Sequence, residues 1–404
     1  ITMPRRTGGF IGHRGLQAPD PPTAVTPTAG NTEVSVAFTA PSDVGDDAIT
    51  GFVVQVSTST GNYSAGSNTG SSSPIVVSSL TNDTAATAKV WAINDYGTSA
   101  PSDASVSFTP SLGPIGLIAG GASGSSGHQR RTEIQYVAIA STGNSADWGD
   151  LTVARWGLAS GSSTTRAVFA YGEDGSGTNQ NVIDYVSLSS AGNASDFGDM
   201  GATKNNSAGA SNGTLAVFSR QNFSAGAYDY VTIASTGNSS SWGTSTRINE
   251  VVATCASPTY GYWCGGDTAT NVIEYLTWSS AGNGADWGDL TAASHDGSGC
   301  SSNTRGCINL GYVSSSNVNT IDYFALSSTG NASDFGNLTS AIISIGESTS
   351  NKIRGIFAGG YTTAYIKSID YITIASTGNA SDFGDLTIKN AWHASTSDSH
   401  GGIA

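Results

Sequence analysis

The amino-acid sequence predicts an all-β protein in which a β-sandwich precedes six copies of a four-stranded unit. Three observations lead to this fold class. Glycine occupies 52 of the 404 positions and charged residues make up only 11%, which disfavours long surface helices and favours short strands joined by turns. Ten of the eleven prolines lie at or before Pro114, so the two parts of the chain differ in composition. One pattern of residues then recurs six times.

The N-terminal segment, residues 1–17, is rich in glycine and basic residues and contains no acidic residue. Such a composition is typical of a flexible basic arm. Its arginines Arg5, Arg6 and Arg14 are the residues expected to anchor the chain in a larger acidic assembly. An ordinary disordered terminus would have the same composition, so both interpretations stay open.

Residues 18–110 contain short runs in which apolar and polar residues alternate, which is the period of a half-buried strand. These runs cover residues 33–38, 49–56 and 86–92, and clusters of turn-forming residues separate them. Several short strands within about ninety residues predict a β-sandwich.

Three short stretches make this segment similar to a fibronectin type III domain. They are Pro21-Pro22 at the entry, residues 38–41 after the second strand and residues 80–84 before the sixth, and residues 92–97 follow that sixth strand. In this chain Phe38 stands where the family usually has tryptophan, and Ala86 where it usually has the corner tyrosine. The resemblance implies a fibronectin type III-like sandwich over residues 18–110.

Residues 111–404 contain an internal repeat with a period of 45 to 49 residues. Its marker is a tyrosine, found at Tyr136, Tyr185, Tyr230, Tyr275, Tyr323 and Tyr371. A Gly-Asn pair begins seven residues after each tyrosine, and an aromatic residue followed by glycine stands twelve residues after it, at Trp148, Phe197, Trp242, Trp287, Phe335 and Phe383. Both intervals are the same in all six copies.

Each copy contains four strand-like runs, which in the last copy are residues 342–346, 355–360, 369–374 and 381–386. A four-stranded unit of about 47 residues has the size of a β-propeller blade. The sequence therefore predicts a six-bladed β-propeller. The repeated aromatic residues are expected to pack between blades, with ligand stacking as the alternative.

The two ends of the repeat region predict how the ring closes. The first copy begins at residues 116–121, which correspond to a second strand, so its innermost strand is missing. The tail, residues 390–396, resembles an innermost strand without a blade of its own. We expect this C-terminal strand to complete the first blade, which protects two sheet edges at once.

The order of the runs resembles the kelch motif, carried here by residues 151–155, 357–360 and 369–371. The sequence of residues 369–387, IDYITIASTGNASDFGDLT, resembles repeats in structural proteins of tailed phages, particularly marine and cyanobacterial ones. That resemblance covers residues 115–404. It implies a virion component rather than a cellular enzyme.

Charge and motif content exclude several function classes. The formal net charge of −14 leaves no basic face for nucleic acid, and no apolar run is long enough for a membrane-spanning helix. The histidines form no catalytic or zinc-like spacing, and no phosphate-binding loop is present. We therefore expect no enzymatic activity, no cofactor and no metal site. Calcium at the repeated Asp-aromatic-Gly turns is the alternative, with Asp147, Asp196, Asp286, Asp334 and Asp382 as ligands.

The four cysteines lie on neighbouring strands of two copies. Cys255 and Cys300 occupy equivalent innermost-strand positions, and Cys264 and Cys307 lie on the strands that follow. Disulfides 255–264 and 300–307 are predicted if the Cα atoms approach within about 7 Å, and free thiols in a packed core are the alternative.

The loops between the second and third strands vary in length, whereas the turn between the third and fourth strands is constant. Variable loops on a fixed scaffold are the usual place for recognition, although neutral drift also produces them. The binding residues predicted from these loops are Arg130, Arg131, Phe223, Tyr361, Tyr365 and Lys367.

These observations together predict a phage virion structural protein: a tail fibre, a spike or a capsid-attached appendage. The expected partners are other virion proteins, bound through the arm, and a host surface glycan or receptor, within an oligomeric assembly located in the virion. The alternatives are a secreted, extracellular bacterial adhesin or lectin, and a propeller enzyme of the sialidase or lyase type.

Overall fold

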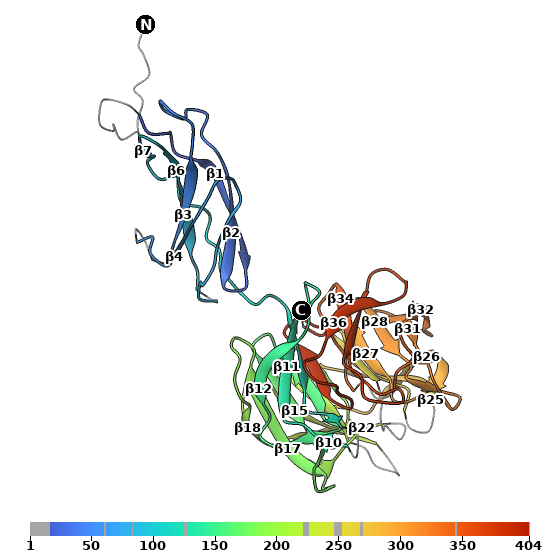
Figure 1. The fold of residues 1–404 in the computed structure, drawn as a ribbon. Helices are drawn as coiled ribbons and strands as arrows, with labels where there is room; N and C mark the ends of the chain where they lie inside the picture. Colours follow the sequence, from blue (N-terminus) through green and yellow to red (C-terminus); the bar gives the residue numbers. More distant parts are fainter. Residues whose placement is uncertain are drawn as a thin grey trace. The chain divides into compact units, whose positions relative to one another are not determined.

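The computed structural model describes residues 17–59, 62–82, 84–124, 128–220, 226–245, 253–266, 270–343 and 346–403. In these ranges every regular element is a β-strand, so the all-β prediction is confirmed. The chain divides into two compact units, Ile1–Gly113 and Pro114–Ala404 (Figure 1). The arm residues Arg5, Arg6 and Arg14 lie outside the described residues.

The N-terminal unit contains two antiparallel sheets. One has the order β1 (Thr23–Gly30), β2 (Glu33–Thr39), β5 (Ile75–Val77), and the other β4 (Gly66–Gly70), β3 (Gly51–Ser57), β6 (Thr87–Asn94), β7 (Gly97–Thr98). Alternate residues of β2, β3 and β6 are buried in one core, as the period-two pattern predicted.

The segment after β7 continues beside β6 with a period of three. Ser99, Ser102 and Ser105 donate their backbone N–H groups to the carbonyl oxygens of Ala92, Val90 and Ala88. The same serine hydroxyls accept hydrogen bonds of 2.9–3.0 Å from the backbone N–H groups of those three β6 residues. The backbone N–H and C=O groups of these three β6 residues, on the side away from β3, are therefore satisfied without a regular strand.

The C-terminal unit contains six four-stranded antiparallel sheets. From the innermost strand outward, the first is β37 (Ala394–Ser397), β8 (Ile115–Ala119), β11 (Glu133–Ala138), β12 (Ala146–Asp150); the second is β14 (Ala159–Ser162), β15 (Arg166–Ala170), β17 (Gln180–Ser187), β18 (Ser195–Lys204); the third is β19 (Gly209–Ser211), β20 (Leu215–Arg220), β21 (Ala227–Thr232), β22 (Ser240–Thr244). The fourth is β23 (Ala253–Ala256), β24 (Tyr260–Cys264), β25 (Thr270–Thr277), β26 (Ala285–Ser294); the fifth is β27 (Ser298–Ser301), β28 (Arg305–Asn309), β31 (Thr320–Ala325), β32 (Ser333–Asn337); the sixth is β33 (Thr349–Ser350), β34 (Arg354–Ala358), β35 (Ser368–Thr373), β36 (Ser381–Asp385).

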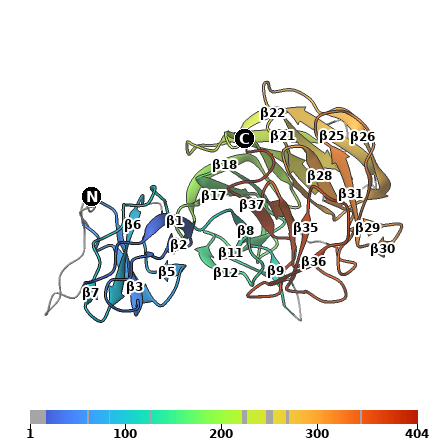
Figure 2. The ribbon, with the colours of Figure 1, turned by 90° about the horizontal axis from the view of Figure 1, so that it is seen from above.

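The innermost strands contact one another in a closed cycle that runs β37, β14, β19, β23, β27, β33 and back to β37. In Figure 2 the C-terminal strand β37 lies next to β8. β37 pairs antiparallel with β8, with Ser395 opposite Ile118. The C-terminal strand thus supplies the fourth strand of the first sheet, which is the pairing that the two ends of the repeat predicted.

The innermost strands consist of small residues, most of them serine, alanine, glycine and threonine, and all are buried. Their hydroxyl groups bond one strand to the next: Ser162 Oγ to Ser397 O, Ser397 Oγ to Ser350 O, Ser350 Oγ to Ser301 O and Ser301 Oγ to Ala256 O, over 2.5–2.9 Å. Only small side chains fit where six strands converge, and the hydroxyls satisfy polar groups that have no access to water.

The repeated Gly-Asn pair joins each sheet to the one before it, in a contact that we call the Asn clasp. In all six copies the asparagine Oδ1 accepts a backbone N–H over 2.9–3.1 Å: Asn144 from Asp385, Asn193 from Asp150, Asn238 from Asp199, Asn283 from Thr244, Asn331 from Asp289 and Asn379 from Asn337. The same close approach of neighbouring sheets requires the glycine that follows the aromatic residue. A Cβ on Gly149, at φ +151°, would overlap the backbone of Gly192 in the next sheet.

The acidic residue before the repeated tyrosine makes a second bond between sheets. Asp184, Asp322 and Asp370 accept hydrogen bonds of 2.6–2.8 Å from the hydroxyls of Thr152, Thr291 and Thr339. Thr152 and Thr339 follow the outer strand of the preceding sheet, and Thr291 lies within it. The repeated tyrosine itself packs edge-to-face on the aromatic residue of its own sheet, with centroids 5.0–6.0 Å apart in all six copies. The repeated residues are therefore packing and linking groups.

One strand assignment from the sequence is wrong. The innermost strand of the sixth sheet is Thr349–Ser350, not residues 342–346. Ile342 is instead buried in the apolar cluster between the fifth and sixth sheets. The apolar run was mistaken for a strand because the true inner strands are made of small polar residues.

The predicted disulfides are absent, and all four cysteines are buried free thiols. Cys255 lies opposite Tyr262 rather than Cys264, whereas Cys300 lies directly opposite Cys307. The Cys255 thiol is hydrogen-bonded to Cys264 and the Cys300 thiol to Cys307, and the two sulfurs also fill the space over Gly306 and Gly355 of the next sheets. These thiols therefore act as small core groups between sheets.

Ending the chain at residue 389 should destabilise the C-terminal unit, because β8 loses its inner partner and the ring of inner strands opens. We expect its melting temperature to fall by about 10 °C or more, at about 2–4 °C for each kcal/mol lost. Scanning calorimetry measures this, with the transition of the N-terminal unit as internal reference. An unchanged transition would show that β37 does not close the ring.

Alkylation of the denatured, unreduced protein should label all four cysteines, since none is bridged. Intact-mass spectrometry with and without prior reduction gives the count. A pair of cysteines that reacts only after reduction would contradict the structure at that hairpin.

Candidate functional site

The variable loops and the connections between successive sheets lie on one rim of the C-terminal unit, which we call the loop rim. The Gly-Asn turns lie on the opposite rim, the turn rim. On the loop rim two short ladders extend the sheets: β9 (Ala122–Ser123) pairs with β10 (Gln129–Arg130), and β13 (Arg155–Trp156) pairs with β16 (Glu173–Asp174). A third ladder there joins β29 (Tyr312–Val313) to β30 (Ser316–Asn317).

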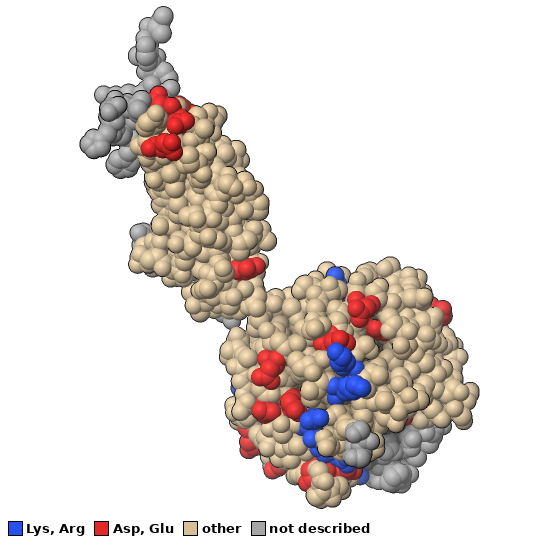
Figure 3. All heavy atoms as spheres, viewed as in Figure 1, with Lys and Arg blue, Asp and Glu red and all other residues tan. Residues whose placement is uncertain are grey.

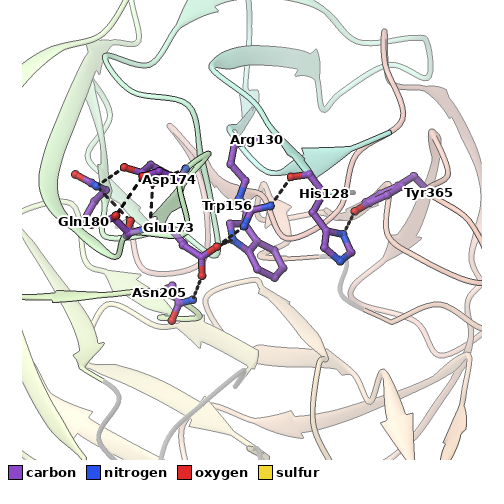
Figure 4. A network of polar contacts seen from close by, with 10 residues as sticks. His128, Arg130, Trp156, Glu173, Asp174, Gln180, Asn205 and Tyr365 are labelled. Atoms are coloured by element: carbon purple, nitrogen blue, oxygen red, sulfur yellow. Dashed lines mark hydrogen bonds and ion pairs between the residues drawn. The ribbon is translucent and has the colours of Figure 1, made fainter. Parts of the chain in front are cut away.

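These ladders position a network of polar contacts between the first and second sheets (Figure 4). β13 places Trp156 directly opposite Glu173 of β16. The Glu173 carboxylate forms an ion pair with Arg130 and accepts hydrogen bonds from Trp156 Nε1 (3.1 Å) and Asn205 Nδ2 (3.2 Å). The guanidinium of Arg130 lies 4.7 Å from the centroid of the Trp156 ring, a cation–π contact.

Aromatic side chains from the first, second and sixth sheets gather beside this network. His128 stacks on Trp156, with centroids 5.4 Å apart and ring planes 9° apart, and Trp392 packs edge-on against Trp156 at 4.8 Å. Tyr365 bonds His128 through its hydroxyl and lies 5.3 Å from the ring of Tyr361. We call the seven residues His128, Arg130, Trp156, Glu173, Tyr361, Tyr365 and Trp392 the rim cluster.

Most of the rim cluster is half-buried, so its rings and polar atoms are partly accessible to solvent. Tyr365 is buried, and this burial raises the pKa of its phenol, which therefore keeps its proton at neutral pH. Trp392 has φ +55°, in the left-handed region that disfavours a bulky side chain. The equivalent positions of the second, third and fifth sheets, Gly157, Asn206 and Asp296, have φ +66°, +50° and +55°, so this conformation recurs around the ring and Trp392 is its bulkiest occupant. Strain of this kind is common where a side chain is held for function.

A loop of the second sheet is ordered next to the cluster by Asp174. Its Oδ1 accepts hydrogen bonds from the Ser176 hydroxyl (2.7 Å) and the Thr178 backbone (3.0 Å), and Gln180 Nε2 donates to Oδ2 over 2.8 Å. The bond from Ser176 is the main cause that lowers the pKa of Asp174. The carboxylate therefore stays ionised and fixes the loop.

Three of the predicted binding residues, Arg130, Tyr361 and Tyr365, come together in the rim cluster. Arg131 bonds Ser123 Oγ nearby, whereas Lys367 lies apart in an exposed ion pair with Asp385 at 2.9 Å. Phe223 lies outside the described residues.

The sequence analysis missed Trp156, Trp392 and Asn205 as site residues. All three lie in connections from one sheet to the next, which reach the same rim as the loops within each sheet. A tryptophan at the entry to an inner strand, where no other copy has an aromatic residue, was the signal that could have identified Trp392.

A buried carboxyl group lies at the centre of the ring near the loop rim. Glu347 is 8% exposed, and it bonds three other sheets: it accepts the backbone N–H groups of Ser160 (3.1 Å), Gly209 (2.7 Å) and Ser395 (3.2 Å). Burial raises its pKa to about 8, against the opposing effect of these donors. Glu347 therefore acts as a central link between inner strands.

Two histidines belong to the closing tail, of which His393 is buried and His400 is half-buried. His393 bonds the Ala358 carbonyl (2.8 Å), and His400 bonds Ser211 Oγ (3.0 Å) within the ring. Burial lowers the pKa of each to about 4, so both are neutral at physiological pH. Within the described residues no group of three or more His, Cys, Asp or Glu side chains could hold a metal ion. The same residues include no helix long and apolar enough to cross a bilayer.

Comparisons with known proteins do not show a family for this chain. No family model matches the chain, and no curated protein matches it. Among solved structures, the crystal structure of domains A168-A170 from titin is similar at 25% identity and a TM-score of 0.22. That match covers 23% of this chain and 32% of the titin chain.

Replacing Glu347 with glutamine should flatten the dependence of stability on pH. In the native protein the carboxyl has a folded pKa near 8 against an unfolded value of 4.5. Its stabilising contribution is complete below pH 4.5 and is lost as the pH rises towards 8, because only the unfolded state releases the proton in that range. We expect the native protein to lose several kcal/mol across this range and E347Q to lose much less.

Urea unfolding at pH 5, 6, 7 and 8 measures this difference, and circular dichroism of E347Q checks that the fold is kept. The histidines titrate in the opposite sense in both proteins: their contribution is complete above pH 6.5 and is lost as the pH falls towards 4. Parallel pH curves for the two proteins would show that Glu347 is ionised in the folded state.

Proposed function

We propose that this chain is a structural protein of a phage virion, with the C-terminal unit as a recognition head. In this proposal the six sheets form a six-bladed, kelch-like β-propeller closed by the C-terminal strand, and residues 18–110 form a fibronectin type III-like sandwich that spaces the head from the arm. The observation that carries the proposal is the rim cluster: aromatic and charged side chains from three sheets converge on the rim of variable loops.

The contrast between the two rims supports a binding role for the loop rim. The turn rim repeats one structure in all six copies, because its glycines and asparagines hold neighbouring sheets together. The loop rim has no such repeated link between sheets, and its side chains differ from copy to copy. Half-buried aromatic rings beside a charged pair are suited to a partner that offers both apolar faces and hydrogen-bonding groups, such as a host surface glycan.

The virion assignment rests on the repeat wording at residues 369–387 and on the basic arm. Its test is direct: an antibody against residues 114–404 should label purified phage particles in immunogold electron microscopy, at one defined position. Particles that contain no such protein by mass spectrometry would refute the assignment and favour a secreted adhesin.

The recognition role predicts that the isolated protein competes with phage for host cells. Purified protein should reduce phage adsorption, and Tyr361→Ala should weaken this competition by about tenfold, since removing an aromatic contact costs about 1–2 kcal/mol. The matched control is Ile353→Ala, which removes a 64% exposed apolar side chain from the turn rim. Equal competition by both variants, with unchanged melting temperatures, would exclude the rim cluster.

A further inference from the structure

A hollow of about 360 Å³ lies beside the rim cluster, between the first and sixth sheets. Ser123 and Arg131 of the first sheet line one side, and Tyr365 and Lys389 of the sixth sheet line the other. This volume is within the range of small-molecule sites, about 300–1,000 Å³. From its lining we infer that the hollow binds the carboxylate of an acidic sugar within a surface glycan. This inference rests on the proposed recognition function.

One edge of the Arg131 guanidinium is bonded within the protein, and the other edge can bind a ligand. Its Nε and Nη2 donate to Ser123 Oγ, which holds the side chain in place. Its Nη1 lies 3.5 Å from Glu133, in a pair whose side chains are 27% and 37% exposed. Such an exposed pair is worth about 0–1 kcal/mol, so a ligand carboxylate can replace Glu133 at little cost. The planar guanidinium also matches a carboxylate in geometry.

Lys389 supplies the second positive charge. Its side chain is exposed, and it has no ion pair among the described residues. The neighbouring cations Lys367 and Arg130 do not line the hollow, and they are paired with Asp385 and Glu173. Arg131 and Lys389 are therefore the cations that the hollow can offer to an anion.

Charge over the whole chain restricts the kind of anion. The net charge of −14 repels polyanions at long range, so a nucleic acid or a heavily sulfated polymer is disfavoured. On the face seen in Figure 3, Lys and Arg side chains of the C-terminal unit gather in one band, whereas Asp and Glu are scattered. A single carboxylate on a largely neutral saccharide needs only such a local site.

Tyr365 connects the hollow to the rim cluster. Its ring lines the hollow and also lies 5.9 Å from the ring of Trp392 and 5.3 Å from that of Tyr361. A saccharide anchored by its carboxylate in the hollow can therefore extend over aromatic rings, on which sugar faces pack.

The turn rim provides a matched control. A hollow of about 370 Å³ there is also lined by an arginine and a lysine, Arg305 and Lys352. The guanidinium of Arg305 donates to the Ile374 carbonyl (2.9 Å) and lies over the Tyr323 ring, so it is already bonded within the protein. Lys352→Gln therefore removes the same charge from a hollow of similar size on the opposite rim.

The test is binding of the full chain to an array that carries sialyllactose, trigalacturonate, their neutral counterparts lactose and methyl-esterified trigalacturonate, and dextran sulfate. We expect a carboxylated saccharide to bind at least about tenfold more tightly than its neutral counterpart, because a hydrogen-bonded charge contributes 1.5–3 kcal/mol. Lys389→Gln should weaken that binding by about tenfold, Arg131→Gln by at least as much, and Lys352→Gln not at all. Lys389 is exposed, so its variant should keep the native melting temperature.

Each other outcome overturns the inference. No binding of carboxylated saccharides, or equal binding of their neutral counterparts, excludes an acidic-sugar site. Binding to dextran sulfate alone assigns the wrong anion, and loss of binding in Lys352→Gln moves the site to the turn rim. The proposed function is judged separately, because competition for host cells that depends on Tyr361 would persist if the carboxylate site were wrong.

Discussion

Six asparagine side chains hold the sheets of the C-terminal unit together, each accepting a backbone hydrogen bond from the sheet before it. One such bond contributes only about 1 kcal/mol. The same bond recurs in all six copies, however, and all six can form only if neighbouring sheets keep a constant spacing. The last clasp, from Asp385 to Asn144, joins the end of the repeat to its beginning. The C-terminal strand then has one place left, beside β8.

Closure also determines where the rim cluster forms. The residue that leads into the closing strand is Trp392, which meets Trp156 of the second sheet and Tyr361 of the sixth. The candidate site therefore lies where the two ends of the repeat meet. The other copies have no aromatic residue at the equivalent position of the sequence, as at Gly157, Asn206 and Asp296, and cannot provide the same ring.

The interior of the ring is polar, which is unusual for a protein core. Hydroxyl groups of small inner-strand residues bond across neighbouring sheets, and Glu347 collects three backbone N–H groups at the centre. The strands converge too closely for large apolar side chains, so the apolar packing lies between the outer parts of adjacent sheets. Groups without water must bond one another, and these bonds favour one arrangement of the six inner strands.

The sequence by itself determined the all-β class, the six-fold repeat and the role of the C-terminal tail, because glycine content, fixed intervals and an unpaired strand are local properties. Its prediction that Arg130, Tyr361 and Tyr365 of the variable loops bind a partner stays a prediction, and the structure places these three residues in one cluster. The sequence misplaced the sixth inner strand, since small polar strands give no hydrophobic period. It also predicted bridges for Cys255 and Cys300, which stay free thiols, since being neighbours in a hairpin does not by itself give two cysteines the geometry of a disulfide. Only the tertiary structure brought Trp156, Trp392 and Glu347 to their partners, because those contacts join sheets that are far apart in the chain.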